Sequence, residues 1–124
     1  MLDHQLDEES AILTVRPEAE LTKEDFERLA ALVDPFIESH GTLAGLLVIA
    51  ESFPGWEGLS GLVGHLRFVR DHHRSIARVA IASDAKIAET IPRLVDHFVA
   101  AEIRQFPLSD VDAARRWIAA GDDD

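Results

Sequence analysis

Residues 43–50 read LAGLLVIA, an apolar stretch in the middle of the chain. Every position is apolar or glycine, so both faces of an extended strand here are hydrophobic. Strands of this kind lie inside parallel sheets whose two faces are covered by helices. Eight residues are too few to span a bilayer, which takes about 18 or more. The stretch therefore predicts the central strand of an α/β domain.

Alternating strands and helices are expected around this strand. Period-2 and period-3.6 apolar patterns separate the two types. The strands are expected at residues 2–7, 12–15, 43–50, 76–82 and 102–108. The helices are expected at residues 22–39, 59–73, 84–99 and 111–118, with Pro92 dividing or kinking the third. This order predicts a single domain over residues 1–124, with an N-terminal β-hairpin and then alternating β and α elements around a mostly parallel sheet flanked by helices.

The first helix carries clear end signals. Thr22 can cap its start, and Asp25 stands where the acid of a capping box answers the cap. Pro35 is expected to kink the last turn or to interrupt its hydrogen bonding. His40 and Gly41 then supply a stop, because glycine accepts the left-handed conformation that follows many helices.

The composition limits the class of protein. The chain has 124 residues, no cysteine and a net charge of −11. The lack of cysteine excludes disulfide scaffolds, zinc fingers, iron–sulfur sites and thiol catalysis. A chain with this much negative charge repels the phosphate backbone of nucleic acids and anionic lipid, so no nucleic-acid binding is expected. No signal peptide is visible at the start of the sequence, which predicts a cytoplasmic protein.

Five segments together resemble one family. They read LTKEDF at 21–26, LVIAE at 47–51, GWE at 55–57, RVAIASD at 78–84 and AARRWI at 113–118. The chain resembles a SpoIIAA-like protein of the STAS/SEC14-type group. The resemblance implies a STAS-like fold in a small bacterial cytoplasmic protein, often dimeric, with no established reaction. It also implies binding of an apolar or lipid-like ligand and association with membranes.

The resemblance bears on phosphorylation. Anti-sigma-factor antagonists of this fold carry an Asp-Ser-Ser-Gly-Leu signature whose first serine accepts phosphate. Ser60, Gly61 and Leu62 match its end, which places Leu59 at the acceptor position. Leucine cannot carry phosphate, so only Ser60 and Ser52 are left nearby as acceptors.

No catalytic, metal or cofactor motif is evident, and we expect a non-enzymatic protein. His65, His72 and His73 lack the three- or four-residue spacing of helical metal ligands, and we expect solvated histidines. Glu51 and Glu57 flank a loop, where one carboxyl group could act as a general acid and the other as a general base. Acidic loops are common in a chain with this many carboxylates, so an ordinary surface loop is the alternative. Phosphate-binding glycine loops and a nucleophile elbow are absent from the sequence.

The loop at residues 51–58 and the helix after it hold the candidate ligand-binding residues. Phe53 and Trp56 suit the lid of an apolar pocket, a core plug or an interfacial anchor. The predicted ligand-binding residues are Phe53, Trp56, Leu59, Leu62 and Leu66. The predicted head-group or partner patch is Arg67, Arg70 and Arg74, with Arg78 beside it; a solvated face is the alternative. Gly61 and Gly64 suit either close packing or a ligand.

Three functional hypotheses follow. The first is a module that binds an apolar or lipid-like ligand and contacts the membrane peripherally. The second is a protein–protein regulatory STAS module without the usual phosphoserine. The third is an enzyme. An apolar cavity favours the first, an exposed patch near the second helix favours the second, and a buried Glu51 or Glu57 favours the third.

Overall fold

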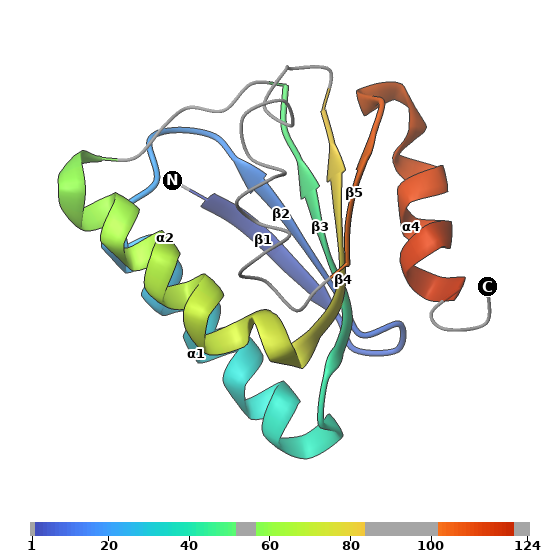
Figure 1. Cartoon of the computed structure of the whole chain (residues 1–124), viewed down its shortest axis with the longest axis horizontal. Helices are drawn as coiled ribbons and strands as arrows, with labels where there is room; N and C mark the ends of the chain where they lie inside the picture. The colour runs from blue at the N-terminus through green and yellow to red at the C-terminus, as the bar shows by residue number, and fades with distance from the viewer. Residues whose placement is uncertain (1, 52–56, 84–101, 121–124) are drawn as a thin grey trace.

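The computed structural model describes residues 2–51, 57–83 and 102–120. Five strands form one mixed sheet in the order β1-β2-β3-β4-β5 (Figure 1). The strands are β1 (Leu2–Asp7), β2 (Ile12–Pro17), β3 (Leu43–Ile49), β4 (Ile76–Ala82) and β5 (Glu102–Phe106). β1 and β2 form an antiparallel hairpin, and the other neighbours pair in parallel. The predicted hairpin and mostly parallel sheet are confirmed.

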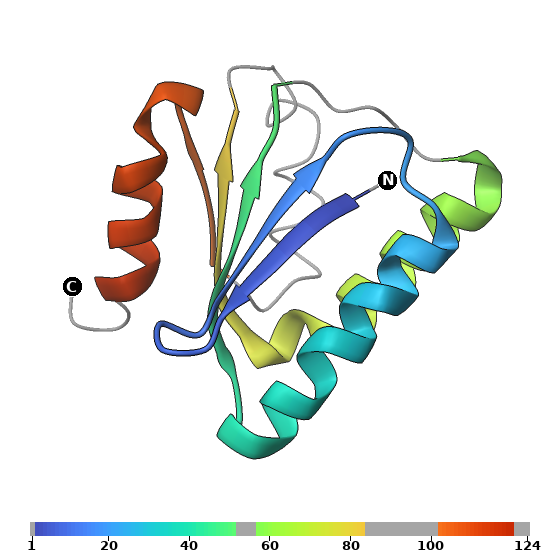
Figure 2. The same ribbon diagram turned by 180° about the vertical axis from the view of Figure 1, so that it is seen from behind.

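Helices lie on both faces of the sheet. They are α1 (Lys23–His40), α2 (Gly58–His72) and α4 (Val111–Ala120), with short 3-10 turns at His73–Ser75 and Leu108–Asp110. α1 and α2 lie on one side of the sheet, and α4 lies on the other (Figures 1 and 2). The predicted helix at 84–99, with Pro92, lies outside the described residues.

The sheet is hydrophobic on both faces, as the central stretch predicts. Leu13 and Val15 belong to the core under α1, together with Phe26. Leu47 belongs to the core on the other face, where Ile118 of α4 covers it. Leu13 and Leu47 have no exposed surface.

Gly45 lets α4 approach the sheet closely. A Cβ atom at this position would lie 2.4 Å from Cγ2 of Ile118 and 2.9 Å from the carbonyl oxygen of Arg78. Real Cβ contacts are longer than this, so any other residue at position 45 would push α4 outward or shift β4.

The ends of α1 follow the predicted signals. The Asp25 carboxylate accepts a hydrogen bond from the Thr22 backbone N–H at 2.9 Å, and the Thr22 hydroxyl accepts one from the Asp25 N–H at 3.1 Å. The helix continues through Pro35 to His40 rather than ending at the proline. Gly41 then closes it with φ of +91°, and its N–H donates to the Ile37 carbonyl at 2.7 Å.

Candidate functional site

α2 packs on α1 through a face that carries glycines. Its buried residues are Gly61, Gly64, Phe68 and His72. A Cβ atom at position 64 would lie 3.1 Å from Cα of Lys23, so the two helix backbones are close at this point. Close packing therefore explains Gly64, and a ligand is not needed for it.

The opposite face of α2 exposes large apolar side chains. Leu59 keeps 75% of its surface exposed and Leu66 keeps 60%, while Leu62 is half-buried. Leu59 and Leu66 are seven residues apart, so they lie two turns apart on one side of the helix. We call Leu59, Val63, Leu66 and Arg70 the outward face of α2.

This orientation bears on the predicted ligand-binding residues. The sequence predicts that Leu59, Leu62 and Leu66 bind the ligand, and Leu59 and Leu66 lie on the exposed side of α2. The glycine and phenylalanine side of α2 is the buried one, because it allows a close approach to α1. Two other predicted ligand-binding residues, Phe53 and Trp56, lie outside the described residues.

The predicted arginine patch is present in part. Arg67, Arg70 and Arg74 are exposed on or just after α2. The Nε atom of Arg70 donates to the Asp71 carboxylate at 2.9 Å, which lowers the pKa of Asp71 and raises that of Arg70. Three arginines against one aspartate leave a local excess of two positive charges.

Arg78 does not belong to this patch, contrary to expectation. It is buried under α4, with 7% of its surface exposed. Its guanidinium donates to the Trp117 carbonyl, lies 4.8 Å from the centre of the Trp117 ring and has its Nε 3.5 Å from the Glu102 carboxylate. The sequence pattern of β4 could have predicted this burial. Arg78 lies two and four residues before the buried Ala80 and Ala82, and residues at this spacing lie on the same face of a strand.

His65 and His72 are packed rather than solvated, so the expectation was wrong for these two; the side chain of His73, the third, lies outside the described residues. His65 stacks on Phe26, with ring centroids 4.8 Å apart, and burial lowers the pKa of its imidazole. His72 is 7% exposed. Its Nε2 lies 2.7 Å from the carboxylate of Asp34, and its Nδ1 lies 2.8 Å from the Phe68 carbonyl.

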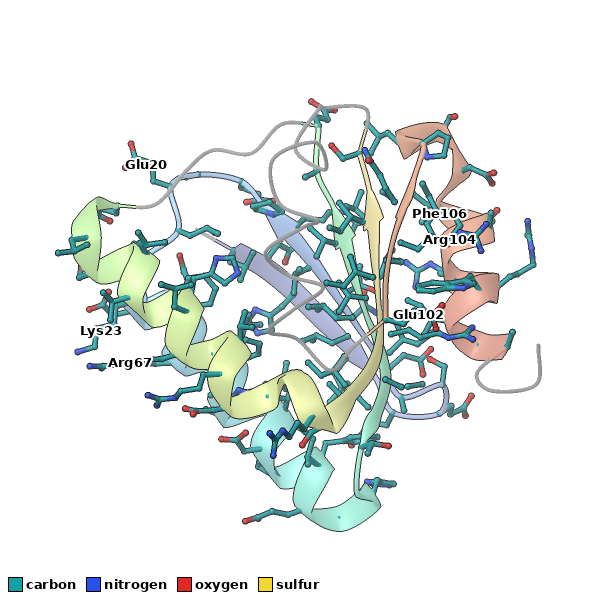
Figure 3. All side chains as sticks on the ribbon, in the orientation of Figure 1. Glu20, Lys23, Arg67, Glu102, Arg104 and Phe106 are labelled. Atoms are coloured by element: carbon teal, nitrogen blue, oxygen red, sulfur yellow. The ribbon has the colours of Figure 1, made fainter. Side chains whose placement is uncertain are left out.

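A shallow groove runs between α1 and α2 beside this pair. It has a volume of about 190 Å³, and its walls include Phe26, Gly64 and Phe68. Lys23 of α1 and Arg67 of α2 border it and lie next to each other on the surface (Figure 3). A larger open hollow of about 590 Å³ lies between β1 and the end of α1. Neither hollow is an enclosed apolar chamber.

The acid–base candidates are on the surface. Glu51 and Glu57 are both exposed, so neither is held in an environment that divides acid and base roles. The backbone N–H of Glu57 donates to the Leu21 carbonyl at 2.8 Å, which joins the start of α2 to the start of α1. Within the described residues, no group of three or more histidine, aspartate or glutamate side chains is placed to hold a metal ion.

Sequence comparison assigns the family. The SpoIIAA-like family model matches residues 12–119, which is most of the chain. The chain belongs to the SpoIIAA-like family. The fold of this SpoIIAA-like domain is similar to that of an uncharacterised protein from Shewanella loihica with a SpoIIAA-like fold. The TM-score is 0.71 at 22% sequence identity, over 95% of this chain and 92% of the other, and it supports the fold alone. No curated protein matches the chain.

The start of α2 in this SpoIIAA-like domain differs from a phosphate-accepting site. The position that the resemblance gives to the acceptor holds Leu59, whose side chain is exposed. Ser60 is exposed in the first turn of α2, and Ser52 lies outside the described residues. None of the described helices is long and apolar enough to cross a membrane.

Proposed function

We propose that this SpoIIAA-like domain is a regulatory binding module of the STAS type, and that it docks a partner protein on the outward face of α2. The observation that carries the proposal is the exposure of Leu59 and Leu66 on one side of one helix. Large apolar side chains gathered on a surface mark interaction sites more often than isolated ones do.

The spacing on this face suits a helical partner. Leu59, Val63 and Leu66 follow one another at four and three residues, the spacing of a seam between two packed helices. A partner helix with apolar residues at the same spacing can lie along it. Arg67, Arg70 and Arg74 lie beside or beyond this seam, so acidic side chains next to the partner's apolar stripe complement it.

The charge of the domain favours a protein over a membrane as the partner. The chain carries −11, and an anionic bilayer would repel most of this surface. A partner helix, by contrast, is small enough to place its few acidic side chains against the arginines of α2 without facing the negative charge on the rest of the domain. Peripheral membrane contact therefore becomes an alternative outcome of the test.

The test compares variants of the outward face for a defined complex. Proteins retained by the wild-type domain are identified, purified singly and titrated against it by calorimetry. Leu66→Asp is expected to weaken the complex at least about tenfold, because it places a charge in an apolar contact. Ala31→Asp, at an exposed position of α1, is the matched control, and melting curves confirm that both variants fold.

Two results would contradict the proposal. One is a complex that Leu66→Asp and Ala31→Asp weaken equally, because the contact then lies elsewhere. The other is binding to vesicles of phosphatidylglycerol that depends on Leu66, which would assign the face to a membrane.

A second candidate function is binding of an apolar or lipid-like ligand. The groove between α1 and α2 supports it, because Phe26 and Phe68 form apolar walls while Lys23 and Arg67 suit an anionic head group. Its 190 Å³ is below the roughly 300–1,000 Å³ of most ligand pockets, so it would hold only part of an acyl chain. Phe53 and Trp56 belong to this proposal as the predicted lid.

Native mass spectrometry tests the ligand directly. Protein purified without detergent is expected, on this second candidate, to carry an adduct of fatty-acid or phospholipid mass that Trp56→Ala reduces. A clean protein mass after incubation with lipid mixtures would end it. The SEC14-type grouping and the cytoplasmic location stay predictions.

A further inference from the structure

The outer edge of β1, with the hollow beside it, is a surface distinct from the outward face of α2. Within the described residues β1 pairs with β2 alone, at the opposite end of the sheet from β5. α1 packs beside β1, and Figure 2 shows both elements in front of α2 and β5. The side chains of Asp3, His4 and Gln5 along this strand are exposed. An exposed edge strand offers backbone donors and acceptors to another strand.

Hydrogen bonding at the β1–β2 turn shows which backbone groups of β1 point outward. The Ala11 carbonyl accepts hydrogen bonds from the N–H groups of Ala44 and Gly45 in β3, at 2.9 and 3.3 Å. The C=O and N–H of one trans peptide unit point in opposite directions, so the Ile12 N–H points away from β3 and toward β1. Ile12 lies opposite Asp7, which makes them a hydrogen-bonded pair. Such pairs alternate with non-bonded pairs along an antiparallel ladder.

The other end of the hairpin gives the same alternation independently. Pro17 lies opposite Leu2 and has no N–H, so these two residues cannot exchange a pair of hydrogen bonds. Asp3 and the other odd-numbered residues of β1 therefore bond to β2. The N–H and C=O groups of His4 and Leu6 point to the open edge.

The side chains of these same two residues border the open hollow between β1 and the end of α1. Its volume is about 590 Å³, within the roughly 300–1,000 Å³ of most ligand pockets. Leu32, Pro35 and Phe36 of α1 form its apolar wall. The hollow therefore lies where an added strand, bonded to His4 and Leu6, would place its own side chains.

The charge around this edge is negative. Residues 2–17 carry four carboxylates, on Asp3, Asp7, Glu8 and Glu9, against the single cation of Arg16, which leaves an excess of three negative charges. The last three turns of α1, residues 30–40, carry aspartate and glutamate but no lysine or arginine. The C-terminal end of a helix also has a partial negative charge. A cationic partner complements all of these groups.

We propose that β1 binds an extended basic segment of another protein as an additional antiparallel strand. Residues of this segment opposite His4 and Leu6 exchange backbone hydrogen bonds with them and share their face, so apolar side chains there enter the hollow. Residues opposite Asp3 and Asp7 lie on the other face, where lysine or arginine pairs with the carboxylates. The recognised segment thus alternates apolar and basic residues.

Charge separates this partner from other occupants of the edge. β1 carries Asp3 and Asp7 and has no lysine or arginine, so pairing with β1 of a second copy would bring like charges together. Charged side chains on an edge strand commonly protect it from self-association. The same acidic groups repel anionic lipid and attract a basic strand.

The main test is a titration of the whole isotope-labelled chain with the peptide Lys-Val-Lys-Val-Lys-Val-Lys, blocked at both ends and followed by NMR. Saturable shifts are expected for the amides of β1 and the last turn of α1, and they are expected to weaken with added salt. The control peptide Lys-Lys-Val-Val-Val-Lys-Lys has the same composition and charge without the alternation. It is expected to bind at least about tenfold more weakly, because it cannot place its valines and lysines on opposite faces.

A pair of variants at His4 tests the backbone pairing. His4→Pro removes an N–H that points away from β2, so the β1–β2 ladder keeps its bonds. The variant is expected to raise the dissociation constant of the alternating peptide about tenfold, because a carbonyl of the peptide then lacks a donor. His4→Ala keeps the N–H and is the matched control, expected to bind like the wild type. Circular dichroism checks that both variants fold.

Two further variants test the hollow and the charge. Ser39 is exposed at the rim of the hollow, and Ser39→Trp is expected to block the hollow and abolish saturation by the peptide. Glu8→Gln is expected to weaken binding about two- to fivefold, the size of an exposed ion pair. Asp7 is left unchanged because its carboxylate accepts hydrogen bonds from the N–H groups of Glu9 and Ser10 in the turn.

Four results would overturn the proposal. One is the absence of saturable shifts at β1 with the alternating peptide. The second is a set of shifts at Leu59 and Leu66 instead, because the peptide then occupies the outward face of α2. The third is equal binding by His4→Pro and His4→Ala, which would mean that charge alone holds the peptide. The fourth is a concentration-dependent shift at β1 without peptide, which would assign the edge to a second copy. The docking proposal is tested separately by Leu66→Asp, so the two can fail independently.

Discussion

His72 and Asp34 connect α2 to α1 through a buried imidazole. Both ring nitrogens lie within hydrogen-bond distance of an acceptor, the Phe68 carbonyl on one side and the Asp34 carboxylate on the other. The imidazole therefore connects the backbone of α2 to a side chain of α1 through its two ring nitrogens. The His72 side chain is 8% exposed and that of Asp34 is 58% exposed, so the imidazole is buried while the carboxylate is in contact with water.

We expect a measurable coupling between these two residues. In a double-mutant cycle with His72→Ala and Asp34→Ala, chemical denaturation is expected to give a coupling free energy of about 1 kcal/mol. The exposed pair Arg70 and Asp71 serves as control, and its coupling is expected to be below about 0.5 kcal/mol. Additive effects at His72 and Asp34 would show that the contact contributes nothing to stability.

Asp25 gives a pH dependence whose sign follows from its contacts. Burial by itself raises the pKa of this carboxyl, but hydrogen bonds from the Thr22 backbone, the Thr22 hydroxyl and Arg28 together lower it below its usual 3.8. A lowered pKa in the folded state contributes stability above the unfolded pKa. This contribution is lost as pH falls through the folded value.

The corresponding prediction compares Asp25→Asn with the wild type. At neutral pH the variant is expected to be less stable by about 1 kcal/mol, the usual size of a capping contribution. The difference is expected to shrink as pH falls below 3.8 and through the lower folded pKa, because the wild-type carboxylate is then protonated first in the unfolded and next in the folded chain. Urea titrations at several pH values measure it, and a difference that stays constant down to the acid limit would contradict the assignment.

At this residue scale, sequence patterns anticipated local contacts better than distant ones. The capping box of Thr22 and Asp25 is confirmed, and it could be predicted because its two residues are three positions apart. Asp34 and His72 are 38 residues apart. Their pairing depends on how α2 sits on α1, and no spacing within either segment contains that information.

At the scale of elements, the sequence predicted the existence of α2 but not its buried face. The sequence left two explanations open for Gly61 and Gly64, close packing or a ligand, because glycine adds no hydrophobic surface of its own. The glycine side is buried, since Gly64 lets the backbone of α1 come within contact distance. Leu59 and Leu66 thus lie on the surface, and the loop residues predicted to accompany them, Phe53 and Trp56, lie outside the described residues.

The contact between α4 and the sheet gives a sharper test of element packing. Gly45→Ala is expected to lower the unfolding free energy by about 1–3 kcal/mol, because its Cβ would overlap Ile118 and the Arg78 carbonyl. Thermal or urea unfolding measures the loss. Ile118→Ala removes one of the two clashes, so Gly45→Ala is expected to cost less in that background. An equal cost in both backgrounds would place the strain at the Arg78 carbonyl instead.

At the scale of the whole molecule, α2 with its outward face lies on one side of the sheet, whereas α4 lies on the other side (Figure 1).

The net charge of −11 has a consequence for stability. Excess charge of one sign destabilises the compact state through self-repulsion. The ion pairs between Lys23 and Glu27 and between Arg70 and Asp71 are exposed and contribute little in return. Salt shortens the range of the repulsion from about 30 Å at 0.01 M to about 3 Å at 1 M. Sodium chloride is therefore expected to stabilise the domain.

We expect the rise in Tm between low and high salt to be about 3–6 °C, which corresponds to about 1 kcal/mol for a chain of this size. Two exposed substitutions separate charge from other effects of salt. Glu18→Lys changes the net charge from −11 to −9 and is expected to reduce the rise, whereas Arg116→Glu changes it to −13 and is expected to enlarge it. A Tm that falls with salt in all three proteins would mean that attractive pairs outweigh the excess negative charge, and that the distribution of charges governs the stability of this domain more than their sum.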